Sequence, residues 1–284
     1  MLKAYYRLTK PGIIYGNTLT AAAGFLLASH GDVHFVRLLA VLTGTVLVIA
    51  SACVFNNYID RGIDAKMSRT KKRALVSGKI TGPQALMYAG VLGVAGFAIL
   101  ATGTNALTLC IGIVGFIDYV VFYTWAKRHT MLAALVGSIS GATPIAAGYT
   151  AVSNTFDAGA LLVFIVLVLW QMPHFYAIAM FRQDDYAAAR IPVLPIVQGI
   201  RRTKIQILLY IAAFAAAVTA LTVYNITGYT FLAVMCLLTG VWFWRGLQGF
   251  AAMDDKRWAR KMFLFSLIII LALSVLLSVD TCLP

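Results

Sequence analysis

Apolar runs long enough to cross a membrane fill most of the chain. A helix needs about 20 apolar residues to span a hydrocarbon layer roughly 30 Å thick, and nine runs approach that length. Because lipid offers no partner for backbone polar groups and the runs lack the alternation of barrel strands, they predict helices. The expected helices cover residues 11–29, 36–58, 83–103, 105–125, 131–150, 158–180, 204–224, 229–247 and 259–279.

The predicted fold class is therefore an all-α polytopic membrane protein. Hydrophobic residues make up 61% of the 284 residues and charged residues 12%, and the mean hydropathy is +0.86. A soluble core has no use for so much apolar surface. We expect a single membrane domain over residues 1–284, whose first helix stays as an anchor because no cleavable signal peptide precedes it.

Basic residues predict the orientation, since loops that stay in the cytosol accumulate Lys and Arg. The N-terminus and every second connection carry nearly all of the 23 basic residues, and only Arg37 falls on the other side. The connections on that side, around His30, Asn105, Asn154 and Asn225, are short and nearly neutral. We therefore expect the N-terminus inside the cell and the C-terminus outside.

The net charge of +13 does not indicate a nucleic-acid-binding protein, because the charges are spread over loops near the membrane rather than along one face. Topology and anionic head groups explain the excess, so membrane lipid is the expected partner and nucleic acid is not. The cysteines lie in or near separate apolar runs without paired spacing, so neither a disulfide nor a zinc site is expected among Cys53, Cys110, Cys236 and Cys282.

Two connections on the cytosolic side are long, residues 61–82 and 182–203. Long loops in a compact domain are usually functional. Where the first of them begins, Asn56, Asp60 and Asp64 recur every four residues, so the three side chains share one face of a helix. This shared face is the first candidate site.

Two carboxylates one turn apart repel each other, and a charge costs about 2.5 to 3.5 kcal/mol at the centre of a membrane and less near its edge. A cation is therefore expected beside them. Oxygen ligands of this kind suit Mg²⁺, which one or two carboxylates hold together with substrate phosphates. The plainer alternative is a solvated helix end that pairs with Arg61 or Lys66.

A dense basic run, residues 69–73, follows the acidic face. The run alone favours only the inside orientation. Beside a metal on the carboxylates, however, its cations would share the negative charge of a diphosphate group. The two features together predict a diphosphate site.

The second candidate region begins with the segment from Trp170 to Tyr176. Pro173 removes a helical hydrogen-bond donor, so we expect it to kink the helix and to place His174 in a break or a cavity. An ionisable residue inside a membrane is a functional candidate. The alternative is a histidine that only hydrogen-bonds a neighbouring helix.

Other polar residues gather on the same predicted side, and each has two interpretations. Asp184 and Asp185 belong either to the site or to an ordinary charged loop. Tyr123, Lys127 and Arg128 end the fourth helix, where the two cations either join the same mouth or only reflect the positive-inside rule.

The spacing of Asn56, Asp60 and Asp64, followed by residues 69–78, resembles the first signature of the intramembrane aromatic prenyltransferase superfamily. The chain is similar to one branch of that superfamily, the protoheme farnesyltransferases or heme O synthases, at residues 123–128, 141–144, 170–176 and 185–195. The resemblance covers essentially the whole chain.

This resemblance implies nine helices around a central cavity capped by cytosolic loops, in a bacterial inner membrane. It also implies the reaction, in which farnesyl diphosphate alkylates a vinyl group of protoheme (heme B) and water adds. The implied cofactor is Mg²⁺, bound by Asn56, Asp60 and Asp64. These three residues and His174 become the catalytic candidates. The implied substrate-binding residues are Arg69, Lys72, Arg73, Tyr123, Lys127, Arg128, Arg182, Asp184 and Asp185.

One position departs from the superfamily pattern. Relatives that act on aromatic acids carry an aspartate-rich second signature, whose leading position is here His174, and only Asp184 and Asp185 remain of its acidic cluster. The ligands of a second metal are therefore open. A histidine suits an acceptor such as heme, which offers an iron and propionates.

Two other functions stay open at the level of sequence. The first is a polyprenyltransferase that acts on a small aromatic acid such as 4-hydroxybenzoate. The second is a non-catalytic heme-binding or transport protein of the membrane, which would need no diphosphate donor. Whether a heme A synthase or a terminal oxidase docks on the protein is open as well.

Overall fold

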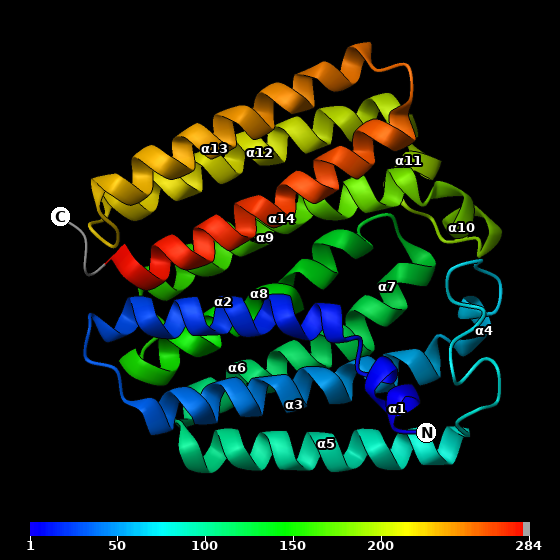
Figure 1. The fold of residues 1–284 in the computed structure, drawn as a ribbon, viewed down its shortest axis with the longest axis horizontal. Helices are drawn as coiled ribbons and strands as arrows, with labels where there is room; N and C mark the ends of the chain where they lie inside the picture. The colour runs from blue at the N-terminus through cyan, green and yellow to red at the C-terminus, as the bar shows by residue number, and fades with distance from the viewer. Residues whose placement is uncertain (281–284) are drawn as a thin grey trace.

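The computed structural model describes residues 1–280 and is all-helical (Figure 1). The predicted fold class and the nine predicted helices are confirmed, and Cys282 lies outside the described residues. The long helices are α2 (Pro11–Ser29), α3 (Phe35–Ile59), α5 (Gly82–Gly103), α6 (Ala106–Ile117) with its continuations η1 (Asp118–Tyr123) and α7 (Thr124–His129), α8 (Ala133–Ser153), α9 (Ala158–Phe181), α12 (Gly199–Val223), α13 (Tyr229–Gln248) and α14 (Asp255–Val279).

Eight of these nine helices are long and apolar enough to cross a membrane, with the α6, η1 and α7 stretch counted as one. The ninth is α8, whose 21 residues include many Gly, Ala, Ser and Thr residues that lower its hydropathy. Those small residues lie inside the bundle, where they permit close helix packing. The lower hydropathy of α8 therefore reflects its central position.

The two long loops contain short helices that the sequence did not predict. These are α4 (Arg61–Asp64) in the first loop and α10 (Gln183–Ala188) and α11 (Leu194–Val197) in the second. Together with α1 (Leu2–Leu8) and α7, they lie at one end of the bundle, on the right in Figure 1, whereas α14 ends on the left. The polar loops expected to share one side of the membrane therefore do gather at one end.

Local signals explain where the helices begin and end. At the start of α5, Thr81 and Gln84 bond each other's backbone N–H groups and form a capping box. Asp157 caps α9 by accepting a hydrogen bond from the Ala160 N–H. At the opposite end of α8, Asn154 adopts a left-handed conformation with φ of 53°, which stops the helix.

Helices α2 and α8 pack with their backbones nearly touching. A Cβ atom on Gly24 would lie 2.1 Å from the Ile145 carbonyl oxygen, and one on Gly148 would lie 2.0 Å from the Ala21 carbonyl oxygen. Only glycine fits at either position. This approach places the central helix α8 directly against α2, which borders the cavity described below.

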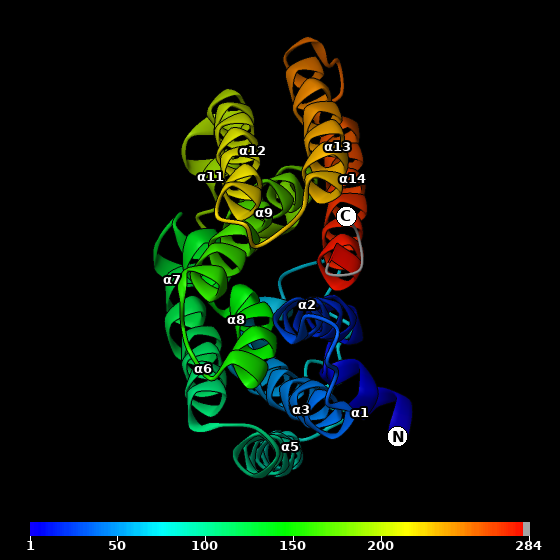
Figure 2. The ribbon, with the colours of Figure 1, turned by 90° about the vertical axis from the view of Figure 1, so that its left-hand side faces the viewer.

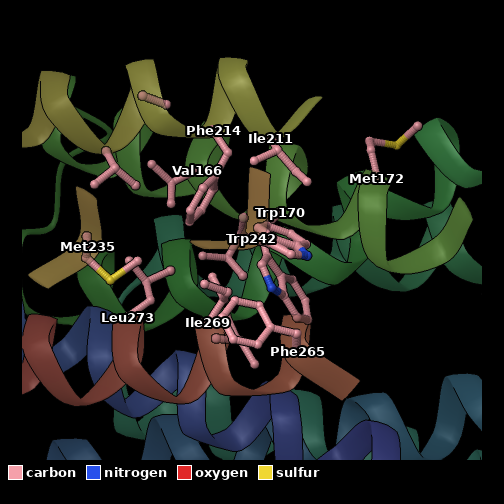
Figure 3. Close-up of a cluster of buried hydrophobic side chains, with 14 of the residues drawn as sticks. Val166, Trp170, Met172, Ile211, Phe214, Met235, Trp242, Phe265, Ile269 and Leu273 are labelled. Atoms are coloured by element: carbon pink, nitrogen blue, oxygen red, sulfur yellow. The ribbon is translucent and has the colours of Figure 1, made fainter. Parts of the chain in front are cut away.

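The helices form two groups, which Figure 2 shows nearly end-on. One contains α2, α3, α5, α6 and α8, and the other contains α9, α12, α13 and α14. A large apolar cluster holds the second group together (Figure 3), with Phe214 and Trp242 packed edge to face at 6.0 Å between ring centroids. Helix α9 runs unbroken through Pro173, so His174 does not lie in a break of the helix, the first of its two expected places.

Candidate active site

The predicted polar face exists. Asn56 lies in the last turn of α3, Asp60 is the residue at which α3 ends, and Asp64 ends α4. The helical hydrogen-bond pattern continues across the junction, because the Asp60 N–H donates to the Asn56 carbonyl and the Asp64 N–H to the Asp60 carbonyl, both at 2.8 Å. The three side chains therefore share one helix face, as the four-residue spacing predicted.

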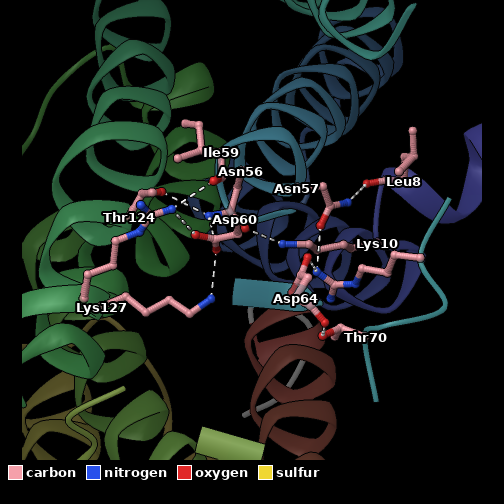
Figure 4. A network of polar contacts seen from close by, with 12 residues as sticks. Leu8, Lys10, Asn56, Asn57, Ile59, Asp60, Asp64, Thr70, Thr124 and Lys127 are labelled. Atoms are coloured by element: carbon pink, nitrogen blue, oxygen red, sulfur yellow. Dashed lines mark hydrogen bonds and ion pairs between the residues drawn. The ribbon is translucent and has the colours of Figure 1, made fainter. Parts of the chain in front are cut away.

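Both carboxylates are almost fully buried and paired with cations (Figure 4). Asp60 accepts from Lys127 Nζ at 2.8 Å and from Arg128 Nη2 at 3.0 Å, and Asp64 pairs with Arg73 Nη1 at 2.6 Å. Lys127 and Arg128 come from a distant part of the chain, and Arg73 comes from the basic run nine residues beyond Asp64, so neither Arg61 nor Lys66 is the partner. The alternative of a solvated helix end is therefore wrong, and the cations of the fourth helix do join the same mouth.

The cations also control the protonation of Asp60. Burial by itself raises the pKa of this carboxyl, but the positive charges of Lys127 and Lys10 and the hydrogen bonds from Lys127 and Arg128 outweigh it. The net effect holds the pKa of Asp60 below its usual value. Asp60 is therefore a carboxylate at neutral pH, the form that binds a metal ion.

Lys10 belongs to this network, although sequence analysis missed it. Its Nζ donates to Asn56 Oδ1 at 2.6 Å and to the Tyr119 hydroxyl at 3.2 Å. Burial lowers the pKa of Lys10 to about 8. The backbone there is left-handed, with φ of 53° just before Pro11, which turns the chain from α1 into α2. The only sequence feature that could have indicated Lys10 was its position immediately before the first predicted membrane span.

A cavity of about 340 Å³ opens among the loops, and we call it the loop-end cavity. Its wall includes the predicted residues Arg69, Tyr123, Lys127, Arg182 and Asp185. The two long loops, which are far apart in the sequence, thus meet around one cavity.

Contacts across the mouth join the two candidate regions. Asp185 accepts hydrogen bonds from both the backbone N–H and the hydroxyl of Ser68, at 2.8 and 2.7 Å. The other predicted residues of these loops face outward: Asp184 is 84% exposed and pairs with Lys256, and Lys72 is exposed and lines neither cavity described here.

A second cavity of about 320 Å³ lies between the helices, and we call it the inter-helix cavity. Its lining is mainly apolar and comes from α2, α3, α5, α6, η1, α8, α9 and α14. Tyr123 and Phe175 line both cavities, so the two spaces meet at these side chains. The central cavity expected from the resemblance is present.

His174 lines the inter-helix cavity, as expected, and it also contacts a neighbouring helix. Its Nδ1 lies 2.7 Å from Ser266 Oγ on α14. Its ring stacks on Trp170 at 4.9 Å between centroids and lies 4.9 Å from Phe263. Both interpretations of this residue therefore hold: it faces a cavity, and a hydrogen bond fixes it in place.

The oxygen donors fit Mg²⁺ on one condition. Two carboxylates and one amide oxygen match what Mg²⁺ takes beside substrate phosphates. However, four cations already contact these groups, and the two carboxylates neutralise only two of their positive charges. The cluster therefore carries a net charge of +2 before any metal binds. Within residues 1–280 no cluster of three or more His, Cys, Asp or Glu side chains could hold a metal alone. The site therefore fits Mg²⁺ together with an anion.

The chain is similar in sequence to known proteins along its whole length. The chain is 50% identical over 285 aligned residues to a protoheme IX farnesyltransferase of Cronobacter sakazakii, covering 100% of this chain and 97% of that protein. It is also 50% identical to a protoheme IX farnesyltransferase of Serratia proteamaculans, covering 99% of this chain and 95% of that one.

Solved structures share the fold. A structure of digeranylgeranylglyceryl phosphate synthase matches with a TM-score of 0.82 at 17% identity, covering 99% of this chain and 98% of that one. A UbiA homologue from Archaeoglobus fulgidus, bound to GPP and Mg²⁺, matches with a TM-score of 0.74 at 14% identity, covering 97% and 99%.

The family profile described as the UbiA prenyltransferase family matches residues 17–268, which include the whole polar face, both long loops and His174. With this match and the full-length relatives at 50% identity, the chain belongs to the UbiA prenyltransferase family.

Proposed function

We propose that the protein transfers the farnesyl group of farnesyl diphosphate to a vinyl group of protoheme. The farnesyl C1 bonds to the vinyl carbon as its bond to the diphosphate oxygen breaks. Water then adds to the porphyrin-side carbon and loses a proton, giving heme O and diphosphate. The observation that carries this proposal is the whole-chain similarity to protoheme IX farnesyltransferases, combined with a buried, cation-rich carboxylate pair.

The loop end would bind the diphosphate. Arg73, Lys127 and Arg128 neutralise Asp60 and Asp64 in the structure, and the excess positive charge there suits a multivalent anion. With diphosphate and a metal bound, Asp60 and Asp64 would serve as metal ligands, and Arg73, Lys127 and Arg128 would bind the phosphate oxygens. The cations then stabilise the charge that builds on the departing diphosphate.

Mg²⁺ is the proposed cofactor, held by Asp60, Asp64 and Asn56. When bound, it would add Lewis-acid charge to the leaving group. The GPP and Mg²⁺ bound to the Archaeoglobus homologue support this assignment at the level of the family. Lys10 would fix the amide of Asn56, because its Nζ already holds that oxygen at 2.6 Å.

The inter-helix cavity would hold the farnesyl chain and the reacting edge of heme. Its lining is mainly apolar and meets the loop-end cavity at Tyr123 and Phe175, so a prenyl chain can extend between helices while its diphosphate stays among the cations. The apolar wall also keeps water from quenching the allylic cation early.

The protein is a multi-pass membrane protein, and we place its loop end on the cytosolic side of the bacterial cytoplasmic membrane. The basic loops gather at that end, as the positive-inside rule requires. Heme A synthase and a terminal oxidase remain the proposed protein partners, since such enzymes consume heme O.

Mass spectrometry of extracted heme tests the proposal. Purified protein is incubated with Mg²⁺, farnesyl diphosphate and either heme B or 4-hydroxybenzoate. We expect heme to gain the mass of one farnesyl group plus one hydroxyl group, and we expect no prenylated acid. Prenylated 4-hydroxybenzoate with unchanged heme would instead assign the protein to quinone synthesis.

A further inference from the structure

The hydrogen bonds around Ser266 determine which nitrogen of His174 carries a proton. Ser266 Oγ lies 2.6 Å from the Phe263 carbonyl oxygen and 2.7 Å from His174 Nδ1. A carbonyl oxygen cannot donate, so the first contact uses the single hydroxyl proton. The contact with His174 must then run the other way, with Nδ1–H donating to Ser266 Oγ.

The consequence falls on the other ring nitrogen. A neutral imidazole carries one proton, so a protonated Nδ1 leaves Nε2 with a free lone pair. Within the part of the chain that the structure describes, no side chain or backbone group hydrogen-bonds Nε2. Among residues 1–280 no salt bridge involves His174, and its ring packs against Trp170, Phe175 and Phe263.

The ring is also held still. Trp170 stacks on one side of it with an interplanar angle of 28°, and Phe263 packs at 41°. Trp170 Nε1 in turn donates to the Ser266 carbonyl at 2.9 Å, so the same turn of α14 holds both aromatic rings. Since His174 lines the inter-helix cavity, this clamp presents an oriented neutral nitrogen base to an apolar space.

We infer that Ser266 is a positioning residue that keeps His174 protonated at Nδ1, so that Nε2 coordinates the iron of the heme substrate. This inference rests on the proposed function, because it takes heme as the acceptor. A hydrogen-bonded partner on the far nitrogen is the usual way in which proteins orient a ligating histidine and raise its basicity. Ligation would fix the porphyrin relative to the farnesyl carbon without adding charge to the cavity.

Heme titration without farnesyl diphosphate tests the inference apart from catalysis. In the detergent-purified protein we expect ferric heme B to give the spectrum of a histidine-ligated iron. His174→Ala should lose that spectrum, and adding imidazole to His174→Gly should restore it. A histidine-ligated spectrum that persists in His174→Ala, or a wild-type protein that binds no heme, would overturn the assignment.

Ser266→Ala tests the positioning role. The histidine remains but loses its partner, so we expect the Kd for heme to rise about tenfold, with a higher KM for heme and an unchanged KM for farnesyl diphosphate. Ser274→Ala is the matched control, because Ser274 is a buried serine on the same helix whose hydroxyl has no hydrogen-bond partner. Equal Kd values and spectra for the two variants would overturn the role of Ser266.

The proposed function can fail separately. The same wild-type preparation is assayed for heme O after farnesyl diphosphate and Mg²⁺ are added. A histidine-ligated spectrum that depends on His174 and Ser266, without any heme O, would refute the transferase proposal and support the inference. Heme O formation together with heme spectra that neither substitution changes would support the transferase proposal and refute the inference.

Discussion

The two parts of the candidate site, the loop end and the inter-helix cavity, differ in how many charged groups they contain. At the loop end, two buried carboxylates pair with three cations, and a fourth cation, Lys10, binds the amide oxygen of Asn56 beside them. In the inter-helix cavity, the main titratable group is His174, which aromatic rings surround. The loop end can exchange its ion pairs for contacts with a charged ligand, whereas the inter-helix cavity surrounds its reactants mainly with apolar side chains.

This difference shows why the cations of the loop end already pair with Asp60 and Asp64 before any ligand binds. An unpaired carboxylate at a membrane edge is costly, so Asp60 and Asp64 are stable there only with Lys127, Arg128 and Arg73 beside them. A metal and a diphosphate would enter together and redistribute these contacts, leaving no buried charge alone. The inter-helix cavity needs no such exchange, because its reactants bring no phosphate into it.

Loss of Asp60 should have the largest effect. Asp60→Ala removes a metal ligand and leaves Lys127 and Arg128 without their partner, so we expect heme O formation to fall about 1,000-fold. Membrane insertion and heme binding in the inter-helix cavity should persist. Heme O yield by mass spectrometry, with heme titration as the control, checks this; a variant with near-normal yield would disprove the metal role.

Removal of Mg²⁺ should separate the two ends without any mutation. Chelation by EDTA is expected to lower turnover about 100-fold, and added Mg²⁺ should restore it. The heme spectrum should not change, because His174 needs no metal from the loop end. Diphosphate release and heme absorbance are measured on one sample, and chelator-resistant release would contradict the account.

Arg73 and Lys71 offer a matched pair of basic residues in the same run. Arg73 contacts Asp64, whereas Lys71 is exposed and lines neither cavity. We expect Arg73→Gln to raise the KM for farnesyl diphosphate about tenfold, equal to about 1.4 kcal/mol, and Lys71→Gln to leave it unchanged. Steady-state kinetics at several concentrations of farnesyl diphosphate measure the KM of each variant. Equal KM values for Arg73→Gln and Lys71→Gln would count against a diphosphate contact by Arg73.

A smaller effect is expected from filling the inter-helix cavity. Gly16 lines it, and a Cβ atom there would meet no atom within 4 Å, so Gly16→Leu adds bulk without a built-in clash. Farnesyl transfer should fall about tenfold relative to transfer of the shorter geranyl group. Gly90→Leu is the control, since Gly90 has equal space but lines neither cavity. Competition between farnesyl diphosphate and geranyl diphosphate gives the ratio of farnesyl to geranyl transfer. We expect this ratio to change in Gly16→Leu and to stay constant in Gly90→Leu.

The neighbouring acidic residues of α10 should give the smallest contrast. Asp185 ties Ser68 across the mouth, and hydrogen bonds from Ser68 hold the pKa of Asp185 below its usual range. Asp184 forms only an exposed pair with Lys256. We expect Asp185→Asn to lower kcat/KM about threefold, and Asp184→Asn to have no measurable effect because exposed pairs contribute little. A larger loss in Asp184→Asn would reverse this assignment.

The sequence predicted the helices well because each long apolar run has one stable solution in lipid. It also predicted the shared face of Asn56, Asp60 and Asp64, since a four-residue spacing is a local property. It could not assign their partners, because Lys127 and Arg73 reach the carboxylates only through tertiary packing.

Other features needed the structure for similar reasons. Lys10 was missed because nothing local links it to Asn56, 46 residues away. The continuity of α9 through Pro173 is one of these features, since a helix packed on several sides tolerates a lost hydrogen bond. The link between His174 and Ser266 spans 92 residues and has no sequence signature.

A structure with Mg²⁺ and a non-hydrolysable thio analogue of farnesyl diphosphate tests the central claim most directly. The account predicts a metal held by Asp60 and Asp64, with Arg73 and Lys127 moved from these carboxylates onto phosphate oxygens, and the farnesyl chain in the inter-helix cavity. A bound analogue that leaves both ion pairs unchanged, with its diphosphate elsewhere, would contradict it.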